Sequence, residues 1–185
     1  MWLCAAGVRA ECATASALDQ YGQDWFGPGA RTFPLKLSTT NAVVCEVTRD
    51  GRPEGWIFRT DQVPPVCKGK RGEIALLVAV SSDARILGVR VLEHKEDPSY
   101  FRRLTETFFS QFRNRRADDT QTSGVDAVTR ATLSSRAIIR DVLEGAGHVV
   151  SLPEVAAKIK TDEQSRLTKA AAMPHNEKLN KEGQL

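Results

Sequence analysis

Two apolar segments separated by a short polar turn constrain the fold more than any other feature of this sequence. Residues 73–80, Glu-Ile-Ala-Leu-Leu-Val-Ala-Val, form a nearly continuous apolar run, as expected for a buried strand. The turn at residues 82–85 leads into residues 86–92, where apolar residues alternate with Gly88 and Arg90. Because a short turn can join only antiparallel neighbours, the two segments predict a β-hairpin.

A second strand pair is expected upstream of the first. Residues 41–48 are rich in β-branched side chains, and residues 54–60 contain Trp56 within another apolar run. Between them lies Asp50-Gly51, a strong signal for a two-residue hairpin turn. The sequence therefore predicts an antiparallel sheet made of two hairpins.

Helices are expected after the strands. Aromatic and aliphatic residues recur at three- and four-residue spacing over 98–112, with Asp97 as the N-cap. A second helix is predicted over 133–144, ended by Gly145 and Gly147. Its inward face is predicted to consist of Leu133, Ala137, Ile138, Val142 and Leu143.

The order of these elements predicts an α+β domain in which helices pack on an antiparallel sheet. We expect this domain at residues 41–150, preceded by a lead-in at residues 16–40. Capping-box spacing at residues 151–154 predicts a helical C-terminal extension over 151–185 that ends in a frayed tail. Residues 1–15 carry a short apolar stretch followed by small residues, which predicts a truncated signal segment without its basic part.

Composition narrows the classes of partner. The chain has 26 Lys and Arg against 23 Asp and Glu, and a net charge of +3 is too weak to predict nucleic-acid binding. Its apolar runs all fall short of the roughly 18 residues that a membrane span needs, so no transmembrane helix is predicted. The four cysteines include no C-x-x-C pair and are interpreted as small hydrophobic residues.

The segment ahead of the second helix carries the candidate chemistry. Thr132 falls at the expected helix start, where unpaired N–H groups and the helix dipole favour a phosphate. Ser134 and Ser135 would add hydroxyl donors, and Arg130 a cation. A purely structural explanation fits the spacing better by itself, with Thr132 as N-cap, Asp126 in a turn and both serines solvated.

Residues 126–132, Asp-Ala-Val-Thr-Arg-Ala-Thr, resemble the flavinylation motif of FMN-binding domains, Asp-x-x-(Ser/Thr)-Gly-Ala-(Thr/Ser). Relatives include subunits of the sodium-translocating NADH:quinone oxidoreductase and Rnf complexes, and the extracytoplasmic domain of nitrous-oxide-reductase regulatory proteins. Residues 69–94 also look like the sheet region of that domain, and the resemblance covers about residues 41–149. It implies FMN joined as a phosphoester to Thr132 (phosphothreonyl-FMN) by a separate flavin transferase. The implied cofactor-binding residues are Thr132, Asp126, Thr129, Arg130, Ala131, Leu133, Ser134 and Ser135.

Two departures from the family pattern bear on the flavin site. Arg130 stands where many members have Gly, which matters if that position requires a positive φ. Ser99-Tyr100 replaces the Gly-containing turn that members have after the proline at this point. Candidates for the slot that holds the flavin ring are Trp56, Phe58, Tyr100 and Phe101, for each of which a core position is the favoured alternative.

The resemblance implies an FMN-binding electron-transfer protein rather than a stand-alone enzyme. It would exchange electrons with a redox partner protein or a membrane electron-transport complex, in a periplasmic or other extracytoplasmic location and in association with the membrane. The sequence around Thr132 offers no His or Lys to activate its hydroxyl, so self-attachment is not expected. Two alternatives stay open: a noncovalent FMN-dependent reductase, and a flavin-free regulatory or interaction module of the same fold.

Overall fold

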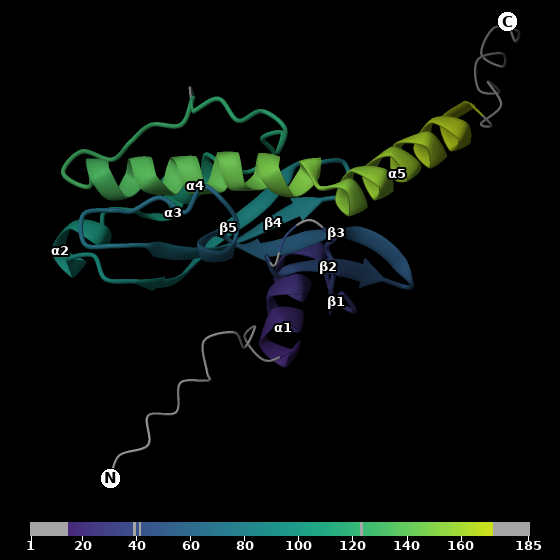
Figure 1. Ribbon diagram of the computed structural model, residues 1–185, viewed down its shortest axis with the longest axis horizontal. Coiled ribbons are helices and arrows are strands. Elements are labelled where there is room, and N and C mark those ends of the chain that lie inside the picture. The colour runs from purple at the N-terminus through teal and green to yellow at the C-terminus, as the bar shows by residue number, and fades with distance from the viewer. Residues whose placement is uncertain (1–14, 39, 41, 123, 172–185) are drawn as a thin grey trace, which may run out of the picture.

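The computed structural model describes residues 15–38, 40, 42–122 and 124–171. A five-stranded antiparallel sheet in the order β1-β2-β3-β4-β5 carries α4 on one face and α1 on the other, and α5 extends from the end of α4 (Figure 1). The elements are α1 (Ala15–Phe26), β1 (Arg31–Pro34), β2 (Val44–Arg49), β3 (Arg52–Arg59), η1 (Thr60–Gln62), β4 (Ile74–Ser81), β5 (Ile86–His94), α2 (Pro98–Phe101), α3 (Glu106–Ser110), α4 (Thr132–Ser151) and α5 (Pro153–Ala171). The predicted α+β class with an antiparallel sheet is confirmed.

Both predicted hairpins are present. Asp50 and Gly51 join β2 to β3 with φ values of 52° and 74°, which is the pair of positive angles that a type I′ turn requires. β4 and β5 pair across the predicted turn at residues 82–85. The structure adds α1 and β1, which the sequence analysis did not predict. β1 has only four residues, and its single buried residue, Thr32, gives no alternating pattern.

The sheet separates two hydrophobic clusters, and β4 contributes to both. Leu76 and Val78 pack under α4 with Trp56 and Phe58, whereas Leu77 faces the α1 side. Residues 74–80 are buried throughout. Burial on both faces therefore explains why this strand is apolar at nearly every position.

Gly88 on β5 determines how closely α1 approaches the sheet. A Cβ atom at this position would lie 2.3 Å from Nε1 of Trp25. We expect Gly88→Ala to lower the free energy of unfolding by about 1–3 kcal/mol, because Trp25 must move to accept the methyl group. Urea unfolding measures this, and adding Trp25→Ala should lessen the penalty of the Gly88 substitution. An unchanged unfolding midpoint in Gly88→Ala would contradict the close approach.

The helix predicted over 98–112 is divided into two short helices. Asp97 caps the first as predicted, since its carboxylate accepts a hydrogen bond from the Ser99 N–H at 2.8 Å. The chain then turns, and Thr105 adopts an extended conformation (φ −85°, ψ 176°) before α3 begins. The apolar spacing was interpreted as one helix because its core-facing residues, among them Phe108 and Phe112, are buried in either arrangement.

The prediction that α4 ends at Gly145 and Gly147 was wrong, because the helix continues to Ser151. These glycines permit close packing instead of ending the helix. A Cβ atom at Gly145 would lie 3.3 Å from the Phe58 ring, and one at Gly147 would lie 2.5 Å from Thr120. No capping box forms at residues 151–154 either, because Ser151 is the last residue of α4 and its hydroxyl donates to a carbonyl of the same helix.

The candidate signal segment lies outside the described residues except for residue 15, and the predicted extension over 151–185 is described only as far as residue 171. Among the helices that the structure describes, none has the length and apolar character needed to cross a membrane. Cys45 is buried in β2, as expected for a small hydrophobic residue, whereas Cys67 lies half-buried in a loop.

Candidate functional site

The first residue of α4 is Thr132, which confirms the predicted position of this threonine at a helix start. The N-cap is Ala131, so the alternative role of Thr132 as N-cap is wrong. A turn precedes the helix, since the Ala131 N–H donates to the Val128 carbonyl at 3.0 Å. The Thr132 hydroxyl donates to the same carbonyl over 3.4 Å, which is a long and weak hydrogen bond.

Arg130 occupies the turn with a φ of 68°, in the left-handed region that favours glycine. The family pattern has Gly at this position, so the structure accounts for that preference. Arginine at such an angle is strained by roughly 1–2 kcal/mol.

We expect Arg130→Gly to raise the free energy of unfolding by up to about 1 kcal/mol. The relief of backbone strain is partly offset because glycine makes the unfolded chain more flexible. The matched control is Asn114→Gly, at a φ of 64° in a separate turn that does not line the cavity. Asparagine tolerates this conformation better than arginine, so its replacement should stabilise less. Urea unfolding of both variants tests this, and a destabilised Arg130→Gly would contradict it.

A cavity of about 250 Å³ opens beside the start of α4. Its lining residues are Lys70, Glu96, Asp97, Tyr100, Arg130, Ala131, Thr132, Leu133 and Ser134. The fold brings three segments together here: the turn and first residues of α4, the loop before β4, and the segment that follows β5. The side chains of Leu133 and Tyr100 stay 61% and 44% exposed, so the cavity has apolar surface at its opening.

The prediction that Leu133 faces inward was therefore wrong. Because α4 begins at Thr132, its buried face starts with Ser134 and Ser135, which the sequence analysis had weighed as solvated. The Ser135 hydroxyl accepts a hydrogen bond from the Val128 N–H at 3.0 Å and donates to the Thr132 carbonyl at 3.2 Å. It stabilises the turn and does not line the cavity.

Glu96 is a buried carboxylate in the cavity wall. It accepts hydrogen bonds from the Arg71 N–H at 2.6 Å, from the Lys70 N–H at 3.2 Å and from the Ser134 hydroxyl. Burial acts to raise the pKa of this carboxyl, but the three hydrogen bonds outweigh it and hold the pKa below its usual value. Glu96 is therefore ionised at neutral pH.

The cavity carries charges of both signs. Lys70 and Arg130 supply two cations, and the Lys70 ammonium lies 5.6 Å from the centre of the Tyr100 ring. Opposite charge comes from Glu96 and from Asp97, whose pKa is lowered by hydrogen bonds from Ser99. A hydroxyl, two cations and a helix start suit a phosphate, and the aromatic and aliphatic side chains suit a flat apolar ring.

The remaining sequence-predicted residues lie outside this cavity. Asp126 and Thr129 are exposed, and the Asp126 N–H donates to Gln111 Oε1 at 2.8 Å. Of the four aromatic candidates for a ring slot, Tyr100 alone lines the cavity, whereas Trp56, Phe58 and Phe101 are buried in the core. Sequence reasoning missed Lys70, Glu96 and Asp97, which no spacing rule connects to Thr132.

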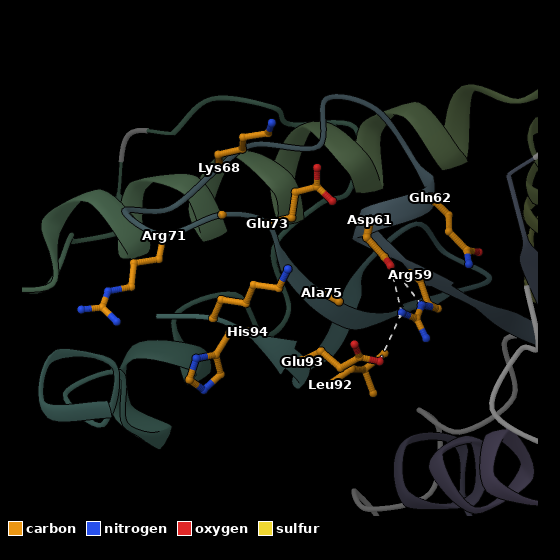
Figure 2. A pocket seen from close by; sticks show the side chains of 12 residues that line it. Arg59, Asp61, Gln62, Lys68, Arg71, Glu73, Ala75, Leu92, Glu93 and His94 are labelled. Carbon is orange, nitrogen blue, oxygen red and sulfur yellow. Dashed lines mark hydrogen bonds and ion pairs between the residues drawn. The ribbon is translucent and has the colours of Figure 1, made fainter. Parts of the chain in front are cut away.

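A larger groove of about 910 Å³ lies on the β3–β4–β5 part of the sheet (Figure 2). Its walls are mostly charged, and Arg59 is paired there with Asp61 at 2.8 Å and approaches Glu93 at 3.9 Å. Ala75 and Leu92 are the aliphatic residues in its lining. It holds none of the motif residues, so the smaller cavity at Thr132 is the better candidate site.

Comparison with known proteins agrees with this choice. Residues 69–145 match the model of the FMN-binding domain family, in agreement with the resemblance noted in the sequence. All residues that line the cavity at Thr132 fall within that range. The chain is also 31% identical, over 97 residues, to a subunit of the proton-translocating ferredoxin:NAD(+) oxidoreductase complex of Clostridium ljungdahlii. That alignment covers 48% of this chain and 52% of the relative, so the chain spans about half the length of that protein.

Proposed function

We propose that this protein is an FMN-binding electron-transfer subunit that carries FMN as a phosphoester on Thr132. One observation supports the attachment site above the others: the threonine of the motif lies at a helix start and lines a cavity that also contains cations and exposed apolar side chains. FMN binding is supported by the match of residues 69–145 to the FMN-binding domain family.

The residues of the cavity fit the parts of FMN. Lys70 and Arg130 would balance the charge of a phosphate at Thr132, and Tyr100 and Leu133 would pack against the flavin ring. A volume of about 250 Å³ lies below the range of about 300–1,000 Å³ for enclosed ligands. FMN would therefore stay partly exposed, as direct electron exchange with a partner requires. When bound, the flavin supplies reversible electron transfer, and the protein supplies its position and electrostatic environment.

Attachment requires a separate flavin transferase. In the described structure the Thr132 hydroxyl donates to the Val128 carbonyl, which cannot take up a proton. The transferase would present FMN activated as a phosphoanhydride. A P–O bond then forms to Thr132 Oγ1, the anhydride bond breaks, the remaining phosphate-containing part of the donor leaves, and the hydroxyl proton passes to a base of the transferase. The resulting phosphodiester keeps one negative charge near the start of α4.

The partner we propose is a membrane electron-transport complex in an extracytoplasmic setting. The name of the Clostridium ljungdahlii relative describes one component of a multi-subunit complex, which supports a partner of this kind. Covalent attachment would also be useful outside the cytoplasm, where lost FMN is not readily replaced.

Intact mass measured under denaturing conditions tests the proposal directly. The full chain should gain the mass of one FMN less water when it is co-expressed with a flavin transferase, and it should stay unmodified without one. A yellow protein that releases all its flavin on acid precipitation would contradict the covalent bond and indicate a noncovalent FMN protein. A colourless, unmodified protein in the presence of transferase and flavin would indicate a flavin-free module.

A further inference from the structure

A single carboxylate joins the three segments that form the cavity. Glu96 follows β5 and is only 6% exposed. Its hydrogen-bond donors are two N–H groups of the loop before β4 and the Ser134 hydroxyl on the first turn of α4. The sequence separations are 26 and 25 residues to Lys70 and Arg71, and 38 residues to Ser134. Glu96 therefore makes tertiary contacts at the place where the cavity is assembled.

The loop is shaped to reach this carboxylate. Its ends are held by the bridge between Lys68 and Glu73 and by a 2.7 Å hydrogen bond from the Gly69 N–H to the Gly72 carbonyl. A Cβ atom at Gly69 would lie 2.9 Å from Glu96 Oε1. The absence of a side chain at this glycine thus allows the loop to lie directly against the carboxylate.

We propose that Glu96 is a positioning residue for flavin attachment. It holds Lys70 and the first turn of α4 in one cavity, so that the Lys70 ammonium lies close to a phosphate bonded to Thr132. This inference rests on the proposed function. Thr132 is two residues from Ser134 on the same helical turn, and Lys70 donates its own N–H to Glu96. Loss of the carboxylate would release both walls while the strands of the sheet keep their pairing.

The chemistry of the three donors explains why an ionised carboxylate stands at this position. A carboxylate accepts hydrogen bonds at both oxygens, whereas an amide has one oxygen acceptor and adds two donors. Oε1 of Glu96 accepts from the Arg71 N–H, and Oε2 accepts from both the Lys70 N–H and the Ser134 hydroxyl. A glutamine oxygen in the place of Oε2 keeps two of the three bonds and sets its NH₂ group against the Arg71 N–H. Glu96→Gln should therefore preserve much of the geometry and remove the charge, whereas Glu96→Ala should lose both.

Flavin attachment to the full chain during co-expression with the transferase tests this role. We expect the initial rate of attachment to fall roughly tenfold or more in Glu96→Ala, the scale expected for loss of charge-assisted hydrogen bonds. Glu96→Gln should restore most of the rate, and Ser134→Ala should show a smaller decrease. The matched control is Glu73→Gln, an exposed carboxylate on the same loop that does not line the cavity, and it should load like the wild type.

A second measurement distinguishes positioning at the flavin from support of the fold. The midpoint potential of loaded Glu96→Gln should be higher than that of the wild type, because removing a nearby negative charge favours the reduced flavin. Loaded Glu73→Gln should keep the wild-type potential. Urea unfolding identifies variants that are unfolded under the assay conditions. If Glu96→Ala is among them, the attachment rate of Ser134→Ala and the midpoint potential of Glu96→Gln provide the test.

The outcomes separate this inference from the function on which it rests. A wild-type chain that stays unmodified overturns both proposals. A wild type that becomes loaded, together with folded Glu96→Ala and Ser134→Ala variants that load at the same rate, overturns the role of Glu96 alone. An unchanged potential in Glu96→Gln would also overturn it.

Discussion

Thr132→Ala is expected to give a folded protein that carries no covalent flavin after co-expression with the transferase. The substitution removes the oxygen that forms the phosphoester, so the loss should be complete and not a change of rate. The fold should tolerate it, because the hydroxyl makes a hydrogen bond of 3.4 Å and alanine is favourable in a helix. We expect a change in unfolding free energy within about 0.5 kcal/mol. Flavin fluorescence of the denatured band and intact mass measure the result.

Two variants control this experiment. Thr132→Ser keeps a hydroxyl at the same position and should become loaded. Thr122→Ala removes an exposed hydroxyl that lies outside the motif and does not line the cavity, so it should also become loaded. Covalent flavin on Thr132→Ala would contradict the assignment, and peptide mapping would then identify the modified residue.

The sheet could be predicted because local signals determine it. The Asp50-Gly51 turn fixes one hairpin, and the polar turn at residues 82–85 fixes the other. β4 is apolar at nearly every position because both of its faces are covered. α1 could not be predicted in the same way, because its contact with the sheet depends on Gly88, which looks like an ordinary interruption of a strand pattern.

Local sequence signals did not predict the end of α4 correctly. Glycine often ends a helix, yet Gly145 and Gly147 lie within α4 because Phe58 and Thr120 approach them closely. The contact with Phe58 is a tertiary one, because this residue lies on β3 and is distant from Gly145 in the sequence.

The sequence predicted the part of the cavity at the start of α4 but not the carboxylate of Glu96 in its wall. Thr132 could be placed at a helix start from the motif and the apolar spacing that follows it. Glu96 could not be connected to it, because 38 residues separate this glutamate from its partner Ser134. The segment around residue 96 looks like an ordinary charged loop, and the fold alone turns one of its carboxylates inward.

Asp141→Asn is expected to raise the free energy of unfolding above about pH 6 and to have little effect near pH 4. Asp141 lies within α4, is 2% exposed and accepts a hydrogen bond from the Cys67 N–H at 2.6 Å. Burial raises the pKa of this carboxyl to about 6, against the opposing effects of the hydrogen bonds from Cys67 and the charge of Arg140. The folded protein thus keeps this side chain protonated up to about pH 6, where an aspartate in the unfolded chain is already charged.

The sign of the pH dependence follows from this shift. In the unfolded chain an aspartic acid loses its proton near pH 3.9, whereas in the folded protein Asp141 keeps it to about pH 6. The folded state binds more protons between these values, so this group lowers stability as the pH rises from about 4 to about 6. A shift of about two units corresponds to roughly 3 kcal/mol at most.

Urea unfolding of Asp141→Asn and the wild type at pH 4, 6 and 8 tests this expectation. The asparagine oxygen can still accept from the Cys67 N–H, but its NH₂ group needs a partner of its own, so we expect a gain of about 1–3 kcal/mol at pH 8. The gain should shrink towards pH 4, where Asp141 is increasingly protonated in both states. The matched variant Asp141→Ala should gain less or be destabilised, because it leaves the Cys67 N–H without its acceptor. Asp141 titrates in the wild type over this pH range, whereas asparagine does not. A difference in unfolding free energy between the two proteins that stays constant from pH 4 to pH 8 would therefore contradict a role for the charge of Asp141.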